Sequence, residues 1–61
     1  MENTEIRMEL LKTGLRQWQV AAALGMSETT FSRRLRRELP ARERERVLGA
    51  IRELAGGTRH G

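Results

Sequence analysis

Four arginines lie within five positions of this chain, and they are the residues whose chemistry is easiest to interpret. They are Arg33, Arg34, Arg36 and Arg37. A guanidinium group presents a rigid fork of donors, which fits both phosphate oxygens and the edge of guanine. The cluster therefore points to a nucleic-acid surface. The alternative interpretation is a solvated helix face that only keeps the protein in solution, and the elements that carry the cluster decide between the two.

The composition argues against several other kinds of site. Of 61 residues, 12 are basic and 8 are acidic, which leaves a net charge of +4. The chain contains no cysteine, so it has neither disulfides nor a thiolate metal site. Its one histidine, His60, lies beside Gly61 with no second metal ligand nearby. Ser27 and Ser32 have no histidine near them in the sequence that could activate a hydroxyl as a nucleophile. We expect no enzyme activity, no cofactor, no bound metal and no small-molecule substrate.

Apolar residues recur at helical spacing along most of the chain and predict four helices. The expected helices cover residues 4–12, 17–24, 28–37 and 40–55. Alternating apolar runs with turn dipeptides, which indicate strands, are absent. The predicted fold class is all-α, with a small four-helix domain over residues 1–55 and a flexible tail over residues 56–61. No apolar run approaches the roughly 20 residues that span a membrane, so we expect no membrane contact.

The ends of the first and fourth helices have local signals. Asn3 or Thr4 can cap the first helix, and Gly14 is the residue type usually found just after a helix C-terminus. Pro40 suits the first position of the fourth helix, and the pair of glycines at positions 56 and 57 should stop it. The apolar faces are expected at Ile6, Leu10 and Leu11 in the first helix and at Val47, Ala50, Ile51 and Leu54 in the fourth.

A short turn containing glycine separates the two middle helices. Ala21 is small where two helices must cross closely, Gly25 can take the left-handed conformation that ends a helix, and the Ser27 hydroxyl can accept a hydrogen bond from a free amide of the next helix. Two helices joined in this way form the unit that places its second helix in the major groove of DNA. On such a helix, the arginine cluster favours a DNA-binding surface over a merely solvated face.

The third predicted helix divides into a buried and an exposed side. Phe31 and Leu35 lie about 40° apart on a helical wheel and define the buried side. Residues near the N-terminus of a helix in the groove reach the base edges, and Arg33 has the strongest claim because a bidentate contact with guanine is the commonest specific one. Glu28 is ambiguous, since its charge also favours a helix N-terminus. The predicted base-contacting residues are Glu28, Thr29, Thr30, Ser32, Arg33 and Arg36.

A second group of residues is predicted to contact phosphates. Gln17 opens the second helix, where amides commonly bind a phosphate, and Arg16 adds charge there. Trp18 has two interpretations: it folds over the side of the small core, or its indole N–H donates to a phosphate or packs in a dimer interface. The predicted phosphate-contacting residues are Arg16, Gln17, Trp18, Ser27, Arg34 and Arg37.

The segment of residues 12–21, KTGLRQWQVA, together with residues 24–27 and 31–33, resembles the Xre-like helix-turn-helix family of phage Cro and lambda-type repressors. It is most similar to the very short versions from phages and conjugative elements. The resemblance implies a lambda-repressor-like domain of four helices, with or without a short fifth turn, that regulates transcription, often as a dimer on a palindromic operator. It also implies phosphate contact by Gln17 and base contacts by Glu28, Thr29, Ser32 and Arg33.

The chain departs from this family in three respects. Family members usually carry Ser or Thr in place of Arg16, so the usual cap of the second helix is missing. They commonly bury an apolar residue three positions after Phe31, whereas this chain has Arg34 there and Leu35 one position later, which could rotate the end of the third helix. Most relatives also have a fifth helix, so this chain is expected to complete its core as a homodimer.

The leading hypothesis is a cytoplasmic, nucleoid-associated protein that binds double-stranded DNA specifically and regulates transcription in a phage or mobile element. A different class of function is a small protein-interaction module, adaptor-like or antitoxin-like. Its working surface would be the fourth helix, through Val47, Ile51 and Leu54, together with Trp18. RNA binding through the arginines is the third hypothesis, and it lacks the stacking aromatic side chains that such binding commonly uses.

Overall fold

The computed structural model describes residues 3–57 and places them in four helices, with no strand in this range. The helices are α1 (Thr4–Thr13), α2 (Gln17–Ala23), α3 (Glu28–Arg34) and α4 (Ala41–Gly57). The predicted all-α, four-helix class is therefore confirmed for the described residues. None of these helices is long and apolar enough to cross a membrane.

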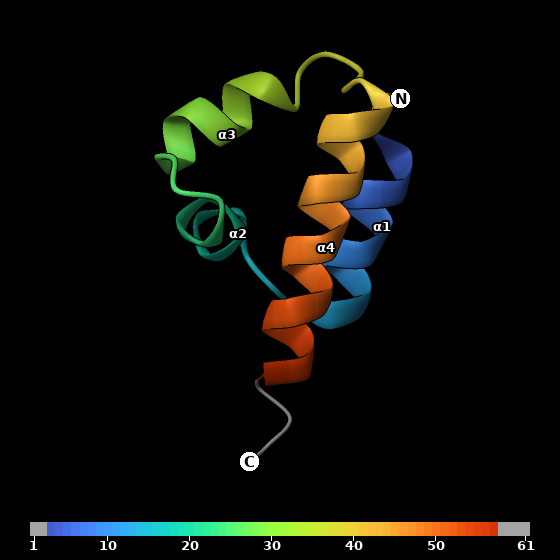
Figure 1. Ribbon diagram of the computed structural model, residues 1–61, viewed down its shortest axis with the longest axis vertical. Helices are drawn as coiled ribbons and strands as arrows, with labels where there is room; N and C mark the ends of the chain where they lie inside the picture. Colours follow the sequence, from blue (N-terminus) through green and yellow to red (C-terminus); the bar gives the residue numbers. More distant parts are fainter. Residues whose placement is uncertain (1–2, 58–61) are drawn as a thin grey trace.

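Helix α1 lies alongside α4, and the two run in the same direction along the longest axis of the molecule (Figure 1). Helices α2 and α3 pack on each other beside this pair, and α2 also contacts α4. Helix α1 begins at the end of the molecule where the linker from α3 enters α4 (Figure 1). This arrangement brings the start of the described chain next to residues that follow α3.

Buried apolar side chains from all four helices and from the α3–α4 linker form a single core. Phe31 and Leu35 point inward, as the wheel predicts, and Ala21 is fully buried in α2. Leu10, Leu15 and Leu54 are among the half-buried residues that pack around this core. The buried core residues are Ile6, Val20, Ala21, Phe31, Leu35, Leu39, Val47, Leu48 and Ile51.

The apolar face of α1 differs from its prediction at one residue. Leu11 is 83% exposed, although its spacing predicts a place in the apolar stripe. Helix α1 packs mainly against α4, so only Ile6 and the half-buried Leu10 meet the core, and the next residue is turned away by about 100°. Leu48 and the linker residue Leu39 are buried in addition to the predicted set.

Helix α3 ends at Arg34, three residues before its predicted end. The N–H groups of Arg36 and Arg37 each donate to the carbonyl three residues back, at 3.2 Å, so the chain tightens into a turn after the helix. The prediction of a helix over residues 28–37 was wrong for its last three positions. The physical reason is a contact from outside the segment, because the Asn3 side chain bonds two carbonyls of this turn and linker.

Helix α4 begins at Ala41, one residue later than predicted. Pro40 directly precedes it, and the Pro40 carbonyl accepts a hydrogen bond from the N–H of Arg44 at 2.9 Å. At its other end the helix includes Gly56 and Gly57, which the sequence predicts as a stop. The rest of the predicted tail, residues 58–61 with the histidine at position 60, lies outside the described residues.

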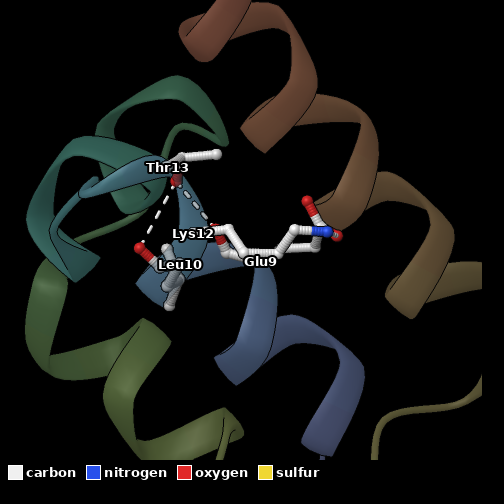
Figure 2. Close-up of polar contacts among 4 residues, drawn as sticks. All are labelled: Glu9, Leu10, Lys12 and Thr13. Carbon is white, nitrogen blue, oxygen red and sulfur yellow. Dashed lines mark hydrogen bonds and ion pairs between the residues drawn. The ribbon is translucent and has the colours of Figure 1, made fainter.

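The side chain of Thr13 closes the end of α1 (Figure 2). Its hydroxyl donates to the carbonyl of Glu9 at 2.8 Å and lies 3.4 Å from the carbonyl of Leu10. Gly14 follows with a φ of 75°, so the predicted end of this helix is confirmed to within one residue. Figure 2 also shows the exposed ion pair between Lys12 and Glu9, at 3.5 Å, which adds little stability in contact with water.

The turn between α2 and α3 is built as the sequence predicts. Gly25 has a φ of 77°, and its N–H donates three residues back at 3.1 Å. The N–H of Met26 donates to the carbonyl of Ala21 at 3.0 Å, which completes the paired bonds of a Schellman motif. Ser27 then caps α3, since its hydroxyl accepts from the N–H of Thr30 at 3.2 Å.

Gly25→Ala is expected to lower the free energy of unfolding by about 1–2 kcal/mol, because a Cβ disfavours the left-handed conformation. A Cβ at this position would meet no atom within 4 Å, so the loss reflects the backbone alone. Gly25→Asn is the matched control, since asparagine tolerates this conformation better and should lose less. Urea denaturation measures both variants, and equal losses would contradict a backbone origin.

Candidate nucleic-acid interface

The exposed face of α3 and of the turn after it carries all six residues predicted to contact bases. Burial of Phe31 and Leu35 on the opposite side fixes this orientation. A shallow hollow of about 350 Å³ lies on the exposed face. It is lined by Glu28, Thr29, Ser32, Arg33 and Arg36. The structure thus gathers five of the six on one surface that offers both hydrogen-bond donors and acceptors.

Thr30, the sixth of these residues, has its hydroxyl engaged at the start of α3. The Ser27 hydroxyl donates to Oγ1 of Thr30 at 2.9 Å and also accepts from the Thr30 N–H. Both residues are exposed. A phosphate or a base that approached either hydroxyl would therefore extend or replace a hydrogen bond that is already formed.

The linker between α3 and α4 is held by Asn3, which is only 1% exposed. Its Nδ2 donates to the carbonyls of Leu35 at 2.9 Å and of Arg37 at 2.8 Å, and its Oδ1 accepts from the N–H of Leu39 at 2.9 Å. The Asn3 N–H donates to Oε1 of Glu38 at 3.0 Å. Asn3 is the N-cap residue of α1, but its side chain makes no capping hydrogen bond to that helix. The predicted side-chain cap is therefore absent, and the side chain bonds the segment after α3 instead.

The four clustered arginines differ in their partners. Arg34, at the end of α3, forms an ion pair with Glu43 in the first turn of α4. The side chains of the pair are 49% and 37% exposed, so solvent screens it. Within residues 3–57, Arg33, Arg36 and Arg37 form no ion pair with a carboxylate. Three of the four guanidinium groups are therefore available to an anion.

A second hollow, of about 430 Å³, lies between the end of α3 and the start of α4. Arg33, Arg34 and Arg37 line it, together with the two acidic residues Glu38 and Glu43. Glu43 pairs with Arg34, and Glu38 accepts from a backbone N–H. Because three arginines face two glutamates, the hollow keeps a small cationic excess, which suits a phosphate group better than a cation.

The residues predicted to contact phosphates from the second helix lie at the start of α2. Arg16 is the N-cap residue, and its side chain does not cap the helix, as predicted. Gln19 supplies half of a capping box instead, since its Oε1 accepts from the N–H of Arg16 at 2.8 Å. Gln17 is half-buried, whereas Trp18 is 56% exposed, which disfavours the interpretation of Trp18 as a cover over the core.

Three residues that shape this surface were missed in the sequence. Gln19 could have been found, because a glutamine at the third position of a helix is a known capping signal. The spacing of Glu43 gives no sign of its partner Arg34, because the two residues lie on different helices. Asn3 had no local signal for its role, because the groups that its side chain bonds lie 32 to 36 positions away in the chain.

No family model matches this chain, and no curated protein or solved structure matches it. Among residues 3–57, no three histidine, cysteine, aspartate or glutamate side chains are grouped so that they could hold a metal ion. The described residues define a small all-α domain in which one short helix and the turn after it present a cationic, hydrogen-bonding face. The chemistry that this face supports is the binding of an anionic partner with patterned donors and acceptors.

Proposed function

We propose that this protein binds double-stranded DNA sequence-specifically, with α3 in the major groove. The observation that carries the proposal is the face of α3 on which five exposed polar residues line one hollow. The major groove admits an α-helix and presents a distinct donor and acceptor pattern for each base pair. In this arrangement Arg33 and Arg36 donate to guanine, while Thr29 and Ser32 contact neighbouring bases.

The turn between α2 and α3 supports a finer assignment, a lambda-repressor-like helix-turn-helix domain of the Xre-like family. The left-handed Gly25, the capping Ser27 and the buried Ala21 are features of the unit that presents a recognition helix to DNA. On this assignment the protein is a cytoplasmic, nucleoid-associated transcription regulator of phage or mobile-element type. A homodimer would present two copies of α3 to a palindromic operator.

Phosphate contacts on both sides of α3 are proposed to hold it in the groove. Arg37, after α3, and Arg16, before α2, carry exposed guanidinium groups. The exposed indole of Trp18 can donate from the start of α2. The full proposed set is Arg16, Gln17, Trp18, Ser27, Arg34 and Arg37.

An unbiased selection of random duplex DNA by the purified protein, read by sequencing at near-physiological salt, tests the proposed function. Recovery of one motif would support specific recognition. A palindromic motif with half-sites about one helical turn apart would also support a dimer. If no sequence is enriched and all binding vanishes at modest salt, specific recognition is refuted and only a non-specific cationic surface remains.

Arg37→Ala is expected to weaken binding to the selected duplex and to random duplex by the same factor. Arg37 is exposed in the segment after α3, beyond the hollow that the base-contacting residues line, which suits contact with the DNA backbone. Loss of one phosphate contact should flatten the slope of log affinity against log salt by about 1. Fluorescence anisotropy at several salt concentrations measures both, and a loss confined to the selected site would assign Arg37 to base contact instead.

A second candidate function, binding of a protein partner, is favoured by three exposed apolar side chains. Met8, Leu11 and Trp18 are 55%, 83% and 56% exposed. The fourth-helix surface that the sequence suggests for a partner is not available, because Val47 and Ile51 are buried in the core. A partner that is captured by the wild-type protein, lost on Leu11→Ser or Trp18→Ala, and kept when α3 is altered would favour this function.

A further inference from the structure

We infer that Glu43 sets the affinity of this protein for the DNA backbone, because its carboxylate competes with phosphates for Arg34. The inference rests on the proposed DNA binding. It adds a residue from outside the predicted DNA-contacting set, in the first turn of α4. It also gives Arg34 a different role from Arg33, Arg36 and Arg37. Of these four arginines, only Arg34 forms an ion pair with a carboxylate of residues 3–57.

The ion pair between Arg34 and Glu43 lies in the hollow that we propose for a DNA phosphate, so the carboxylate and the phosphate compete for the same guanidinium. Arg34 and Glu43 both line the hollow between α3 and α4, together with Arg33 and Arg37. Nη1 of Arg34 donates directly to Oε2 of Glu43. A phosphate that enters this hollow meets the guanidinium groups of Arg33 and Arg37, which have no ion pair within residues 3–57, and that of Arg34, which is paired with Glu43. It also meets the carboxylate of Glu38, which accepts from a backbone N–H and keeps its charge.

The exposure of the pair makes this competition reversible. With side chains 49% and 37% exposed, both charges remain in contact with water, and such pairs add little to the stability of a fold. A guanidinium that moves from Glu43 to a DNA phosphate also releases counterions from the duplex, which favours the exchange at low salt. Glu43 therefore weakens a phosphate contact of Arg34 without abolishing it.

The test compares two glutamates that differ in their contact with Arg34. Glu43→Gln removes the competing charge, and Glu45→Gln is the matched control, because Glu45 is exposed on the same helix and forms no ion pair within residues 3–57. Binding of a random-sequence duplex is measured for both at several salt concentrations. Glu43→Gln is expected to bind roughly three- to tenfold more tightly than Glu45→Gln, with a salt slope steeper by about 1.

A double-variant cycle identifies the cation involved. In an Arg34→Gln background, Glu43→Gln should bind random duplex no more tightly than Glu45→Gln does in that background. A gain that survives the loss of Arg34, or equal gains from the two glutamate changes in the wild-type background, would overturn the inference, because Glu43 would then act only through net charge. A loss of helical circular dichroism in Glu43→Gln would also overturn it, since the pair would then be structural.

Two different binding results would refute DNA binding and the role of Glu43 separately. A wild-type protein that binds no duplex even at low salt would refute the proposed DNA binding itself, and that result does not depend on any variant. A wild-type protein that binds duplex, with no excess gain for Glu43→Gln, leaves the proposed function intact and refutes only the role of Glu43.

Discussion

Replacing Asn3 with alanine is expected to lower the free energy of unfolding by about 3–5 kcal/mol. The change removes the partners of the Arg37 carbonyl and of the Leu39 N–H. It leaves the Leu35 carbonyl with only the longer bond from Nη2 of Arg7, at 3.4 Å. Each buried polar group left without a partner costs about 1–3 kcal/mol, reduced where water can enter. The left-handed φ of 56° at Asn3 adds roughly 1 kcal/mol for alanine. For a domain of this size the whole stability is on the order of 3–9 kcal/mol, so the expected loss is a large share of it.

Urea denaturation followed by far-UV circular dichroism measures this loss. Asn3→Gly is the matched control, because glycine also removes the side chain but carries no penalty for the left-handed conformation. The glycine variant should therefore be more stable than the alanine variant by about 1 kcal/mol, and both should be far less stable than the wild type. An Asn3→Ala protein that unfolds at the wild-type urea concentration would show that this side chain does not hold the linker.

Arg33→Ala is expected to weaken binding to the selected duplex by about 1–3 kcal/mol and to relax the base preference at one position. Arg33 is exposed, lines the hollow on α3 and pairs with no carboxylate among residues 3–57. Its guanidinium is therefore free to make a bidentate contact with guanine. The variant should keep the unfolding behaviour of the wild type, because the lost side chain takes no part in the core.

A repeated selection of random duplexes with the Arg33→Ala protein measures the change in base preference. Arg52→Ala is the matched control, because it removes the same charge from an exposed position in the part of α4 that lies far from α3 (Figure 1). The control should leave the selected motif unchanged. Equal losses by Arg33→Ala on selected and random DNA would instead assign Arg33 to the phosphate backbone.

Much of the fold could be predicted because its signals act between residues a few positions apart. Gly25 ends α2 and Ser27 caps α3 through hydrogen bonds that span three to five residues. Phe31 and Leu35 lie on the same face of the chain because about one helical turn separates them, and that apolar face is buried. The same local reasoning failed where burial depends on how helices pack against one another. Leu11 has the spacing of a core residue, but it is exposed because no other helix covers it enough to bury it.

The candidate site divides in the same way between local and distant causes. The exposed face of α3 follows from helix periodicity alone, so the five residues around its hollow could be named from the sequence. The end of α3 could not, because Asn3 stabilises the non-helical course of the linker from more than 30 positions away. Periodicity carries no information about such a partner.

The sequence by itself determined the four-helix class, the turn between α2 and α3, and the side of α3 that meets solvent. Each depends on propensity, capping or spacing within a few residues. Only the tertiary structure decided that Asn3 holds the linker and that Arg34, unlike its neighbours, is paired with Glu43. Those contacts join residues on different elements, and they exist only because the shared core brings the start of α1, the end of α3 and the first turn of α4 together.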